Sequence, residues 1–421
     1  MASNDTALDD AIFDDFAAHV APGRAETLRR MGIVFPFGKR DGVYIWDAAG
    51  TRRLINCHCN GGTFNLGHRH PVLVRTLIDA LLSDDGDIGN HHFPSAPRAR
   101  LGRRLAELAP GPLETVVFAS AGGEAVDVAI KVARKKTLRR RIVSARGGYH
   151  GHTGLAVATG DPKYSRPFLI DTRDFAQVPW NDLDAMRAAL TGDEPVAAVI
   201  LETIPATLGM PLPAPGYLAA VKALCQETGA LYIADEVQTG LGRTGKLWAV
   251  EHEGVEPDLL VTGKGLSGGL YPIAATLMTR ALGDVFRDDP WSHIATFGGA
   301  DLGCVVAEKV LDLSSQPEFL AHVVAMSAHL VAGLEAVRTR VPEAGLTEIR
   351  ARGAFMGLAF AGAMDGLRMS KLAFDAGLLC FFAGNDPRVL QLLPPLVTDF
   401  TTADEIVTRM ESALMVKANR R

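Results

Sequence analysis

Cysteine is scarce in this sequence: the chain of 421 residues has five, an odd number, and they are scattered along its length. A small protein held together by disulfides has closely spaced cysteines in an even number, so that class is excluded. The cysteine content predicts free thiols and a reducing, cytoplasm-like location.

An excess of positive charge is also absent, because the formal net charge is −5. Nucleic-acid-binding proteins need a basic surface to attract phosphate, so no nucleic-acid partner is expected. The first fifteen residues contain five aspartates and no lysine or arginine, unlike the basic start of a signal peptide. No apolar run looks long enough to cross a bilayer, so we expect no membrane association.

Residues 57–59, Cys-His-Cys, form the one motif that resembles a metal site. A single residue between the cysteines is tighter than the spacing of zinc-binding pairs, and no second Cys/His pair follows. These cysteines are therefore predicted to be structural or to line a pocket, and no bound metal is expected.

What the sequence does contain is typical of a large soluble enzyme, with 48% apolar and 22% charged residues. Helical periodicity alternates with short apolar runs at residues 115–118, 197–201 and 231–234. Continuous apolar runs between helices favour a buried parallel sheet with helices on both faces. We predict an α/β fold of two or three lobes.

The two ends of the chain have a different pattern. The segment up to about residue 30 is predicted to be helical, and residues 42–47 and 53–56 to form two strands around a turn. A long helical stretch follows residue 303, and the chain ends in a short strand and an amphipathic helix. We therefore expect a large domain over residues 57–305 and a smaller α+β lobe built from residues 1–56 and 306–421.

Lys264 and Asp235 form the most informative pair of residues. Lys264 lies in a glycine-rich turn, and Asp235 ends an apolar strand. A pyridoxal phosphate (PLP) enzyme needs such a pair: the lysine amine forms a Schiff base with the cofactor aldehyde, and the carboxylate keeps the pyridine nitrogen protonated. Read alone, either residue would be an ordinary surface or turn residue, so the interpretation depends on the motifs around them.

Those motifs supply the other contacts that PLP requires. Gly122 and Gly123 follow a strand and open a helix, where free backbone N–H groups can bind phosphate. Tyr149 stands between glycines and offers a flat ring to stack on the cofactor. Gln238 can hydrogen-bond the phenolate oxygen of the cofactor, and Thr296 offers a hydroxyl to a phosphate oxygen.

Together these segments resemble the class III aminotransferases, which are fold type I PLP enzymes typified by ornithine, acetylornithine and 4-aminobutyrate aminotransferases. The resemblance covers nearly the whole chain and is most specific at residues 235–245, DEVQTGLGRTG. It implies that Lys264 carries the Schiff base, that Asp235 pairs with the pyridine nitrogen and that Gln238 contacts the phenolate oxygen. It also implies ping-pong transfer of an amino group from an amine or amino acid donor to a ketone or aldehyde acceptor.

The resemblance further assigns the remaining cofactor contacts. Gly122 and Gly123 are implied to bind the phosphate, and Tyr149 to stack on the ring. Thr296 is implied to reach the phosphate of the neighbouring subunit, because members of this family are at least homodimers with active sites at the interface.

The sequence departs from the family pattern where the substrate is recognised. Many members have an arginine near the C-terminus that clamps a substrate carboxylate, and here that position is Gln391. Many also have a glutamate that pairs with this arginine, and here the run that begins at Glu202 ends in Thr207. Losing one charge would leave its partner unpaired in a pocket, which is costly. The joint loss suggests a pocket redesigned as a neutral unit, so the main substrate is expected not to present a carboxylate there.

Other cations leave an alternative open: Arg40 or Arg388 would receive the carboxylate instead. Two smaller departures are Ala121, where the phosphate cradle usually has serine, and Ala300–Asp301, where Asn-Pro is usual. The loop over residues 89–95 is implied to line the substrate entrance, which makes His92 a tentative member of the substrate pocket, as is Glu202.

Three other functions compete with this interpretation. Racemases, epimerases and a few decarboxylating enzymes use the same scaffold with Lys264 and Asp235, and the missing arginine suits them too. A non-catalytic PLP-binding module would have lost Lys264. An NAD-binding protein would show a strand–GxGxxG–helix unit, which the sequence lacks.

Overall fold

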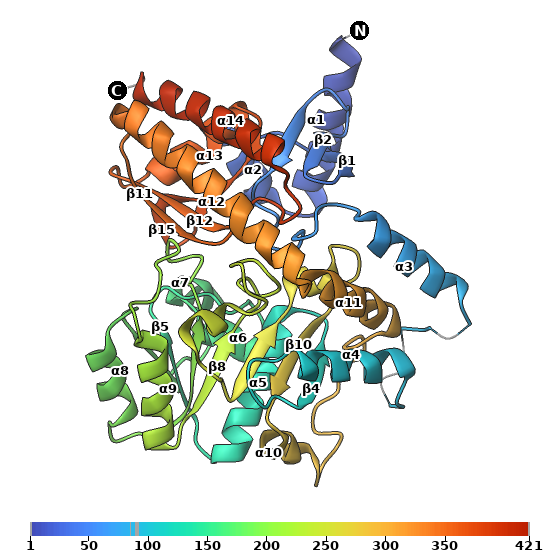
Figure 1. Ribbon diagram of the computed structural model, residues 1–421, viewed down its shortest axis with the longest axis vertical. Helices are drawn as coiled ribbons and strands as arrows, with labels where there is room; N and C mark the ends of the chain where they lie inside the picture. The colour runs from blue at the N-terminus through green and yellow to red at the C-terminus, as the bar shows by residue number, and fades with distance from the viewer. Residues whose placement is uncertain (1, 85, 89–91, 420–421) are drawn as a thin grey trace.

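A seven-stranded, mainly parallel sheet forms the centre of a computed structural model that describes residues 2–84, 86–88 and 92–419 (Figure 1). Only β10 runs antiparallel to its neighbours in this sheet. The three apolar runs predicted as strands are confirmed as β4, β7 and β8, and the α/β fold class is confirmed with them. In spatial order the strands are β4 (Thr115–Ala119), β10 (Ala274–Met278), β9 (Leu259–Thr262), β8 (Leu231–Asp235), β7 (Val196–Glu202), β5 (Arg141–Ala145) and β6 (Phe175–Val178).

Helices cover both faces of this sheet because successive strand residues point to opposite sides. In β7, Val199 and Leu201 pack into one apolar cluster, whereas Ala198 and Ile200 pack into the other. The helices of this part are α3 (Pro71–Leu82), α4 (Ala96–Glu107), α5 (Gly122–Thr137), α6 (Gly154–Thr159), α7 (Pro162–Ser165), α8 (Leu183–Leu190), α9 (Tyr217–Thr228), α10 (Arg280–Gly283) and α11 (Asp301–Ser314).

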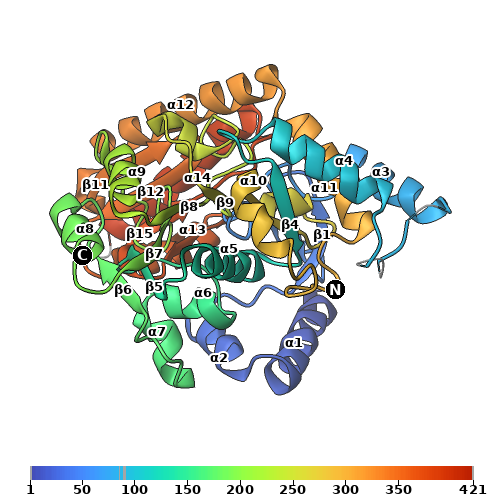
Figure 2. The ribbon, with the colours of Figure 1, turned by 90° about the horizontal axis from the view of Figure 1, so that it is seen from below.

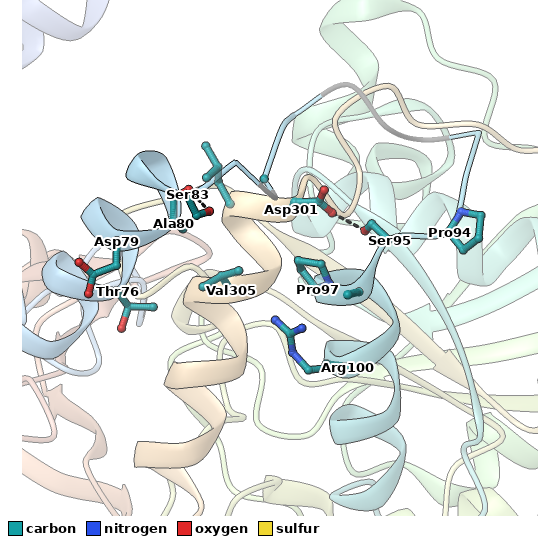
Figure 3. A pocket seen from close by; sticks show the side chains of 13 residues that line it. Thr76, Asp79, Ala80, Ser83, Pro94, Ser95, Pro97, Arg100, Asp301 and Val305 are labelled. Atoms are coloured by element: carbon teal, nitrogen blue, oxygen red, sulfur yellow. Dashed lines mark hydrogen bonds between the residues drawn. The ribbon is translucent and has the colours of Figure 1, made fainter.

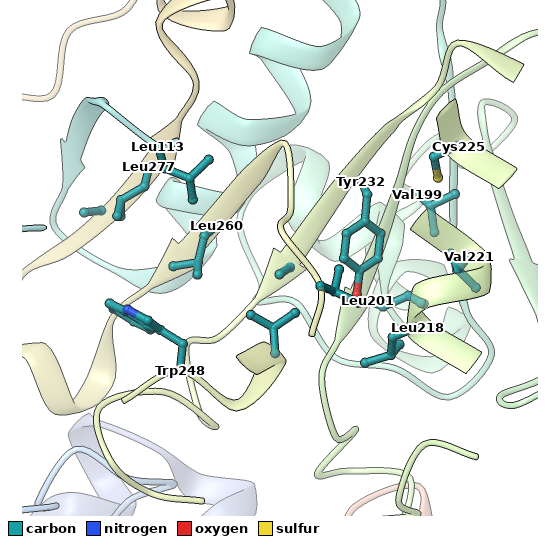
Figure 4. Packing of buried hydrophobic residues seen from close by; sticks show 14 of the residues in the cluster. Leu113, Val199, Leu201, Leu218, Val221, Cys225, Tyr232, Trp248, Leu260 and Leu277 are labelled. Carbon is teal, nitrogen blue, oxygen red and sulfur yellow. The ribbon is translucent and has the colours of Figure 1, made fainter. Parts of the chain in front are cut away.

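The two faces of the sheet are covered by different helices. One face carries α4, α8, α9 and α11, and Figure 4 shows the large rings of Tyr232 and Trp248 that fill this side. Trp248 also donates its indole N–H to the Leu108 carbonyl (2.6 Å). The other face carries α5 and α6, which lie side by side (Figure 2). Burial on both faces explains why all seven residues of β7 are buried.

The N-terminal and C-terminal segments lie together beyond one end of the large sheet, in the upper part of Figure 1. They share a four-stranded sheet, because β13 pairs in parallel with β3. The residue boundaries drawn at 56 and 305 from the sequence stay predictions. The two small sheets contain, in spatial order, β1 (Phe37–Asp41), β2 (Tyr44–Asp47), β3 (Arg53–Asn56) and β13 (Leu378–Leu379), and β11 (Leu346–Arg352), β12 (Phe355–Phe360), β15 (Asp386–Leu392) and β14 (Phe381–Ala383).

Helices complete this second part of the molecule. The predicted N-terminal helical segment is two helices, and the long stretch after residue 303 is most of α11 followed by α12. The helices are α1 (Ala2–His19), α2 (Pro22–Arg30), α12 (Pro317–Arg340), α13 (Asp365–Asp375) and α14 (Phe400–Ala418).

Helix α12 corrects one expectation from the sequence. In the described part of the chain it is long and apolar enough to cross a membrane, judged by length and composition only. However, Val323, Met326, Leu330 and Leu334 are buried in the apolar cluster that also contains residues of α14 and the C-terminal sheet. A core helix of a soluble protein meets the same criteria, so α12 is weak support for a membrane span.

The five cysteines are free thiols, as their number and scatter predicted, and all of them are buried. Cys57 packs in the same apolar cluster as α12, and the thiol of Cys59 donates to the Asn56 carbonyl (3.5 Å). Within residues 2–84, 86–88 and 92–419, no three His, Cys, Asp or Glu side chains are grouped to hold a metal ion.

Candidate active site

A cavity of about 280 Å³ lies at the carboxyl ends of the parallel strands β7 and β8. Ligands bind at this edge of open α/β sheets because the loops that follow the strands meet there. Seven of the residues singled out from the sequence line it together. They are Gly122, Gly123, Tyr149, Glu202, Asp235, Gln238 and Lys264, the last of which follows the carboxyl end of β9.

Asp235 is held at the buried end of the cavity by two donors. Its Oδ2 accepts a hydrogen bond from His150 Nδ1 (2.7 Å), and its Oδ1 accepts one from the backbone N–H of Val237 (3.1 Å). Because a carboxylate only accepts, the His150 proton lies on Nδ1. Burial by itself would lower the pKa of His150, but the hydrogen bond to Asp235 and its charge outweigh burial and raise the pKa.

Glu202 lies beside Asp235, because the two residues are partners in the parallel register of β7 and β8. Its carboxylate accepts the backbone N–H groups of Tyr149 (2.9 Å) and Ala206 (3.2 Å). Burial, helped by the negative charge of Asp235, raises the pKa of Glu202 to about 7 against the opposing effects of His150 and of the two backbone hydrogen bonds. Glu202 therefore connects two loops of the cavity and can change protonation near neutral pH.

Lys264 begins the short 3₁₀ helix η3 (Lys264–Ser267) that follows β9. Its backbone has a φ of +41°, a left-handed conformation that is uncommon for residues other than glycine and is found at functional sites. The amine donates to Gln238 Oε1 (3.3 Å). Burial lowers the pKa of Lys264, and the negative charges of Asp235 and Glu202 only partly oppose this shift.

The N-terminus of α5 has the properties of a phosphate cradle. The helix begins at Gly122, and the residue before it, Ala121, places no side-chain cap on its first N–H groups. A Cβ at position 122 would lie 2.9 Å from Val237 Cγ1, and one at position 123 would lie 2.9 Å from Thr153 Oγ1. Only glycine leaves this surface open, and the exposed N–H groups and the helix dipole favour an anion there.

Tyr149 contributes a half-buried ring to the cavity wall. It contacts His152 and Tyr164 edge-on, with ring centroids 5.2 and 5.6 Å away. Val237 also lines the cavity and packs against the position of Gly122. A flat cofactor with a phosphate and an aldehyde fits these residues, because aromatic ring, amine, carboxylate and anion cradle open into one cavity.

The two positions that depart from the family pattern, Gln391 and Thr207, do not line this cavity as far as the described residues show. The amide of Gln391 is buried and donates to the Ala206 carbonyl (3.1 Å). The hydroxyl of Thr207 donates to the Gly147 carbonyl (3.2 Å). Both side chains thus bond to the backbone of loops that border the cavity.

Thr296 and His92 lie outside the cavity, and both are exposed. The His92 ring lies edge-on to Trp291, at 5.3 Å between centroids. Three residues of the predicted entrance loop, 89–91, fall outside the described residues.

Sequence reasoning missed three residues that contribute to the site. His150 holds Asp235, and Val237 forms part of the cavity wall. Gly61 packs against the lysine, because a Cβ there would lie 3.0 Å from Lys264 Cε. His150 could have been found from its position directly after Tyr149 between glycines, but Gly61 comes from a distant segment and carries no such signal.

A second cavity, of about 690 Å³, lies between α3, α4 and α11. Figure 3 shows Asp301 pointing to Ser95, which donates a hydrogen bond to it, with Arg100 further along α4. Its lining includes none of the residues that the sequence associates with cofactor chemistry.

A half-buried lysine and a buried carboxylate that share one cavity with a glycine cradle, on a mainly parallel sheet, are the residue set of a PLP-dependent enzyme. Comparison with known proteins gives the family: the sequence model of the class-III aminotransferases matches residues 28–414. An uncharacterized aminotransferase of Archaeoglobus fulgidus is 47% identical over 410 residues, which cover 97% of this chain and 95% of that protein. This chain belongs to the class-III aminotransferase family.

Solved structures agree with this membership. The ornithine aminotransferase of Toxoplasma gondii ME49 has a TM-score of 0.89 at 26% identity and covers 98% of this chain and 96% of its own. The acetylornithine aminotransferase of Elizabethkingia anophelis has a TM-score of 0.80 at 27% identity, with coverage of 93% and 98%. The protein is therefore a PLP-dependent aminotransferase with the fold type I architecture, as the sequence predicted.

Proposed function

We propose that this aminotransferase moves an amino group from a donor that places no carboxylate near Gln391 to a ketone or aldehyde acceptor, by a ping-pong mechanism. Candidate donors are amines, amino alcohols or the amino end of a larger metabolite. The observation that carries the proposal is the neutral pair Gln391 and Thr207, whose polar groups bond to the backbone carbonyls of Ala206 and Gly147.

The cavity residues have distinct roles in this proposal. PLP supplies an aldehyde that takes up the amino group and a ring that withdraws electrons from the substrate carbon. Burial lowers the pKa of Lys264, whose amine would hold the cofactor aldehyde and then move a proton at the reacting carbon. Asp235 keeps the ring nitrogen protonated, and His150 orients Asp235. Gln238 contacts the phenolate oxygen.

The remaining cofactor contacts come from the cradle and the aromatic wall. Gly122 and Gly123 present the N-terminal N–H groups of α5 to the phosphate. Tyr149 would pack on the ring, and Val237 lines the same cavity. Both residues line the same cavity as Lys264, which supports this placement.

The alternative carboxylate receptors are less favourable in this structure. The guanidinium of Arg388 binds both oxygens of Asp386, with two hydrogen bonds of 2.8 Å. Arg40 is exposed on β1 and lies over the Phe37 ring, 5.1 Å from its centroid. Arg388, which is paired in this bidentate way, would have to leave Asp386 before it could bind a substrate.

We also propose that the enzyme works as a homodimer in which Thr296 serves the active site of the partner subunit. Thr296 is exposed, and its neighbours Trp291, Ile294 and Phe297 are 57%, 46% and 54% exposed. A cluster of exposed apolar side chains of this kind marks an interaction surface. Thr296 does not line the cavity of its own chain, which supports a role of its hydroxyl in the site of a neighbour.

The substrate proposal predicts how two engineered charges change donor preference. Gln391→Arg introduces an unpaired cation, and we expect the ratio of kcat/KM for α-amino acids over amines to rise roughly 10- to 100-fold, the worth of a charged hydrogen-bonded contact. Adding Thr207→Glu gives this cation a partner in the protein and should reverse part of the gain. The measurement is steady-state kinetics with a panel of donors, half of them without an α-carboxylate. Thr207→Ser, which keeps the hydroxyl, is the matched control.

Absorbance of the bound cofactor gives the direct test with the unaltered enzyme. Conversion to the amino form of the cofactor by amines, and not by simple α-amino acids, supports the proposal. Efficient conversion by glutamate or alanine, unaltered in Gln391→Arg, would contradict the neutral pocket. Entry of solvent deuterium at the α-carbon without conversion would show racemase or epimerase chemistry instead.

A further inference from the structure

The turn between β14 and β15 carries Asn385 from the C-terminal sheet to the loops of the large sheet. Its side-chain Nδ2 donates to the Gly147 carbonyl (2.7 Å), and its backbone N–H donates to the Thr207 carbonyl (2.8 Å). One residue of the C-terminal part therefore holds two loops that border the cavity, although it lies outside the cavity lining.

Gly147 is shaped for this contact. Its φ of +77° is a conformation that side chains rarely adopt, and a Cβ there would lie 2.8 Å from Leu208 Cδ1. Its carbonyl also accepts the Thr207 hydroxyl (3.2 Å), so it receives two side-chain donors. Thr207 thus takes part in the same contact.

The held carbonyl is two residues from Tyr149. The backbone of this loop is tied at three successive residues: Gly147 O by Asn385 and Thr207, Gly148 N by the Ala145 carbonyl (3.1 Å), and Tyr149 N by Glu202 (2.9 Å). Only the first tie includes a residue of the C-terminal sheet. Loss of the Asn385 donor leaves the Gly147 carbonyl with the longer bond from the Thr207 hydroxyl alone, at a residue whose φ and ψ have few steric limits.

A second contact of the same turn reaches the aromatic wall. Tyr164 donates its hydroxyl to Asn385 Oδ1 at a long 3.5 Å, and Lys163 Nζ donates to the Gly384 carbonyl (2.5 Å). The Tyr164 ring is one of the two rings that contact Tyr149 edge-on. The turn thus supports Tyr149 in two ways: through the Gly147 backbone, and through the Tyr164 ring that contacts it.

We infer that Asn385 is a positioning residue for Tyr149: it holds the Gly147 carbonyl and so sets the position of the ring that stacks on the cofactor. The inference rests on the stacking role proposed for Tyr149. It makes the placement of the cofactor depend on the docking of the C-terminal sheet, through a single side-chain amide.

The test compares Asn385→Ala and Asn385→Asp in the full-length holoenzyme. Aspartate has the same size but cannot donate, so both variants lose the bond to Gly147. We expect the Kd for PLP to rise about 5- to 30-fold, the factor for one or two buried hydrogen bonds. We also expect kcat to fall more than KM changes, and the visible circular dichroism of the bound cofactor to decrease. Asn385→Gln, which keeps a donor, should recover part of each property.

Two further variants make the outcomes distinguishable. Asn181→Ala is the control, because it also removes two backbone contacts, to Leu212 O and Ala214 N, away from the cavity. Equal loss of PLP binding in this control would overturn the inference, as would unchanged circular dichroism in Asn385→Asp. Tyr149→Ala tests the underlying role: if it binds PLP normally, the stacking proposal fails, whereas if it alone binds weakly, only the Asn385 inference fails.

Discussion

At the scale of single residues, the chemistry of the cavity depends on which side chains are buried next to one another. Burial lowers the pKa of the Lys264 amine, and it raises the pKa of the Glu202 carboxyl to about 7. Both shifts have the same cause, since a charged group loses solvation in a closed site. Lys264 could be identified from the sequence as an unusual lysine. The raised pKa of Glu202 could not, because the burial of its carboxyl, and to a smaller extent the neighbouring Asp235, are set by the tertiary structure.

Glu202 gives a prediction about stability and pH. Its folded pKa of about 7 lies above its ordinary value of 4.5, so the folded state binds the proton more tightly than the unfolded state. Its contribution to stability is complete below pH 4.5 and is lost as the pH rises through about 7. We expect Glu202→Gln to flatten this part of the profile, by up to about 1.4 kcal/mol for each pH unit. Urea unfolding between these two pH values, with both proteins in parallel, measures the difference, and identical slopes would refute the assignment.

At the scale of elements, the site is formed by strand ends and one helix start. Side chains in β7 and β8 point to opposite faces of the sheet and enter two apolar layers, and the last residues of the two strands, Glu202 and Asp235, line the cavity. Helix α5 adds its uncapped N-terminus at the same edge. These elements were predictable because continuous apolar runs and glycines before a helix are local signals. The pairing order β8–β7–β5 was not, since it depends on contacts between distant segments.

The same glycine-to-alanine substitution is expected to weaken PLP binding at the start of α5 and to stabilise the protein in α4. Gly122→Ala adds a Cβ 2.9 Å from Val237 Cγ1, and we expect roughly tenfold weaker PLP binding because overpacking of this kind costs about 1–3 kcal/mol. Gly102→Ala in α4 meets nothing within 4 Å and should instead stabilise the protein by about 0.5–1 kcal/mol. PLP titration and thermal unfolding of both variants check the pair. Normal PLP binding by Gly122→Ala would argue against a phosphate cradle here.

At the scale of the whole molecule, distant parts of the chain meet around one cavity. The first and last segments share a sheet through β3 and β13, and the turn at Asn385 connects that region to the cavity loops. In our proposal, the exposed loop around Thr296 contributes to the active site of a second copy of the chain. A single-chain cavity thus holds the predicted cofactor groups, whereas Thr296 lies outside it.

The proposed homodimer predicts that two variants, each inactive or weakened by itself, restore each other's activity in a mixed dimer. Lys264→Ala removes the reacting amine, and Thr296→Val removes the hydroxyl proposed to serve the partner subunit. Mixed dimers of the two contain one site with an intact Lys264 and an intact Thr296, so activity should recover on refolding the variants together. Activity assays and PLP titration before and after mixing measure the recovery. A wild-type PLP affinity for Thr296→Val alone, or no recovery in a proven mixed dimer, would contradict the shared site.

The sequence by itself determined the α/β fold class and the family, and it predicted residues that the structure brings into one cavity, because strand burial, glycine turns and the 235–245 run are local patterns. Only the tertiary structure decided that His150 holds Asp235, that Glu202 carries a raised pKa and that Gln391 and Thr207 bond to backbone carbonyls. The reason is physical: a hydrogen bond or a shifted pKa depends on which distant groups share one buried space, and a local pattern does not contain that distance.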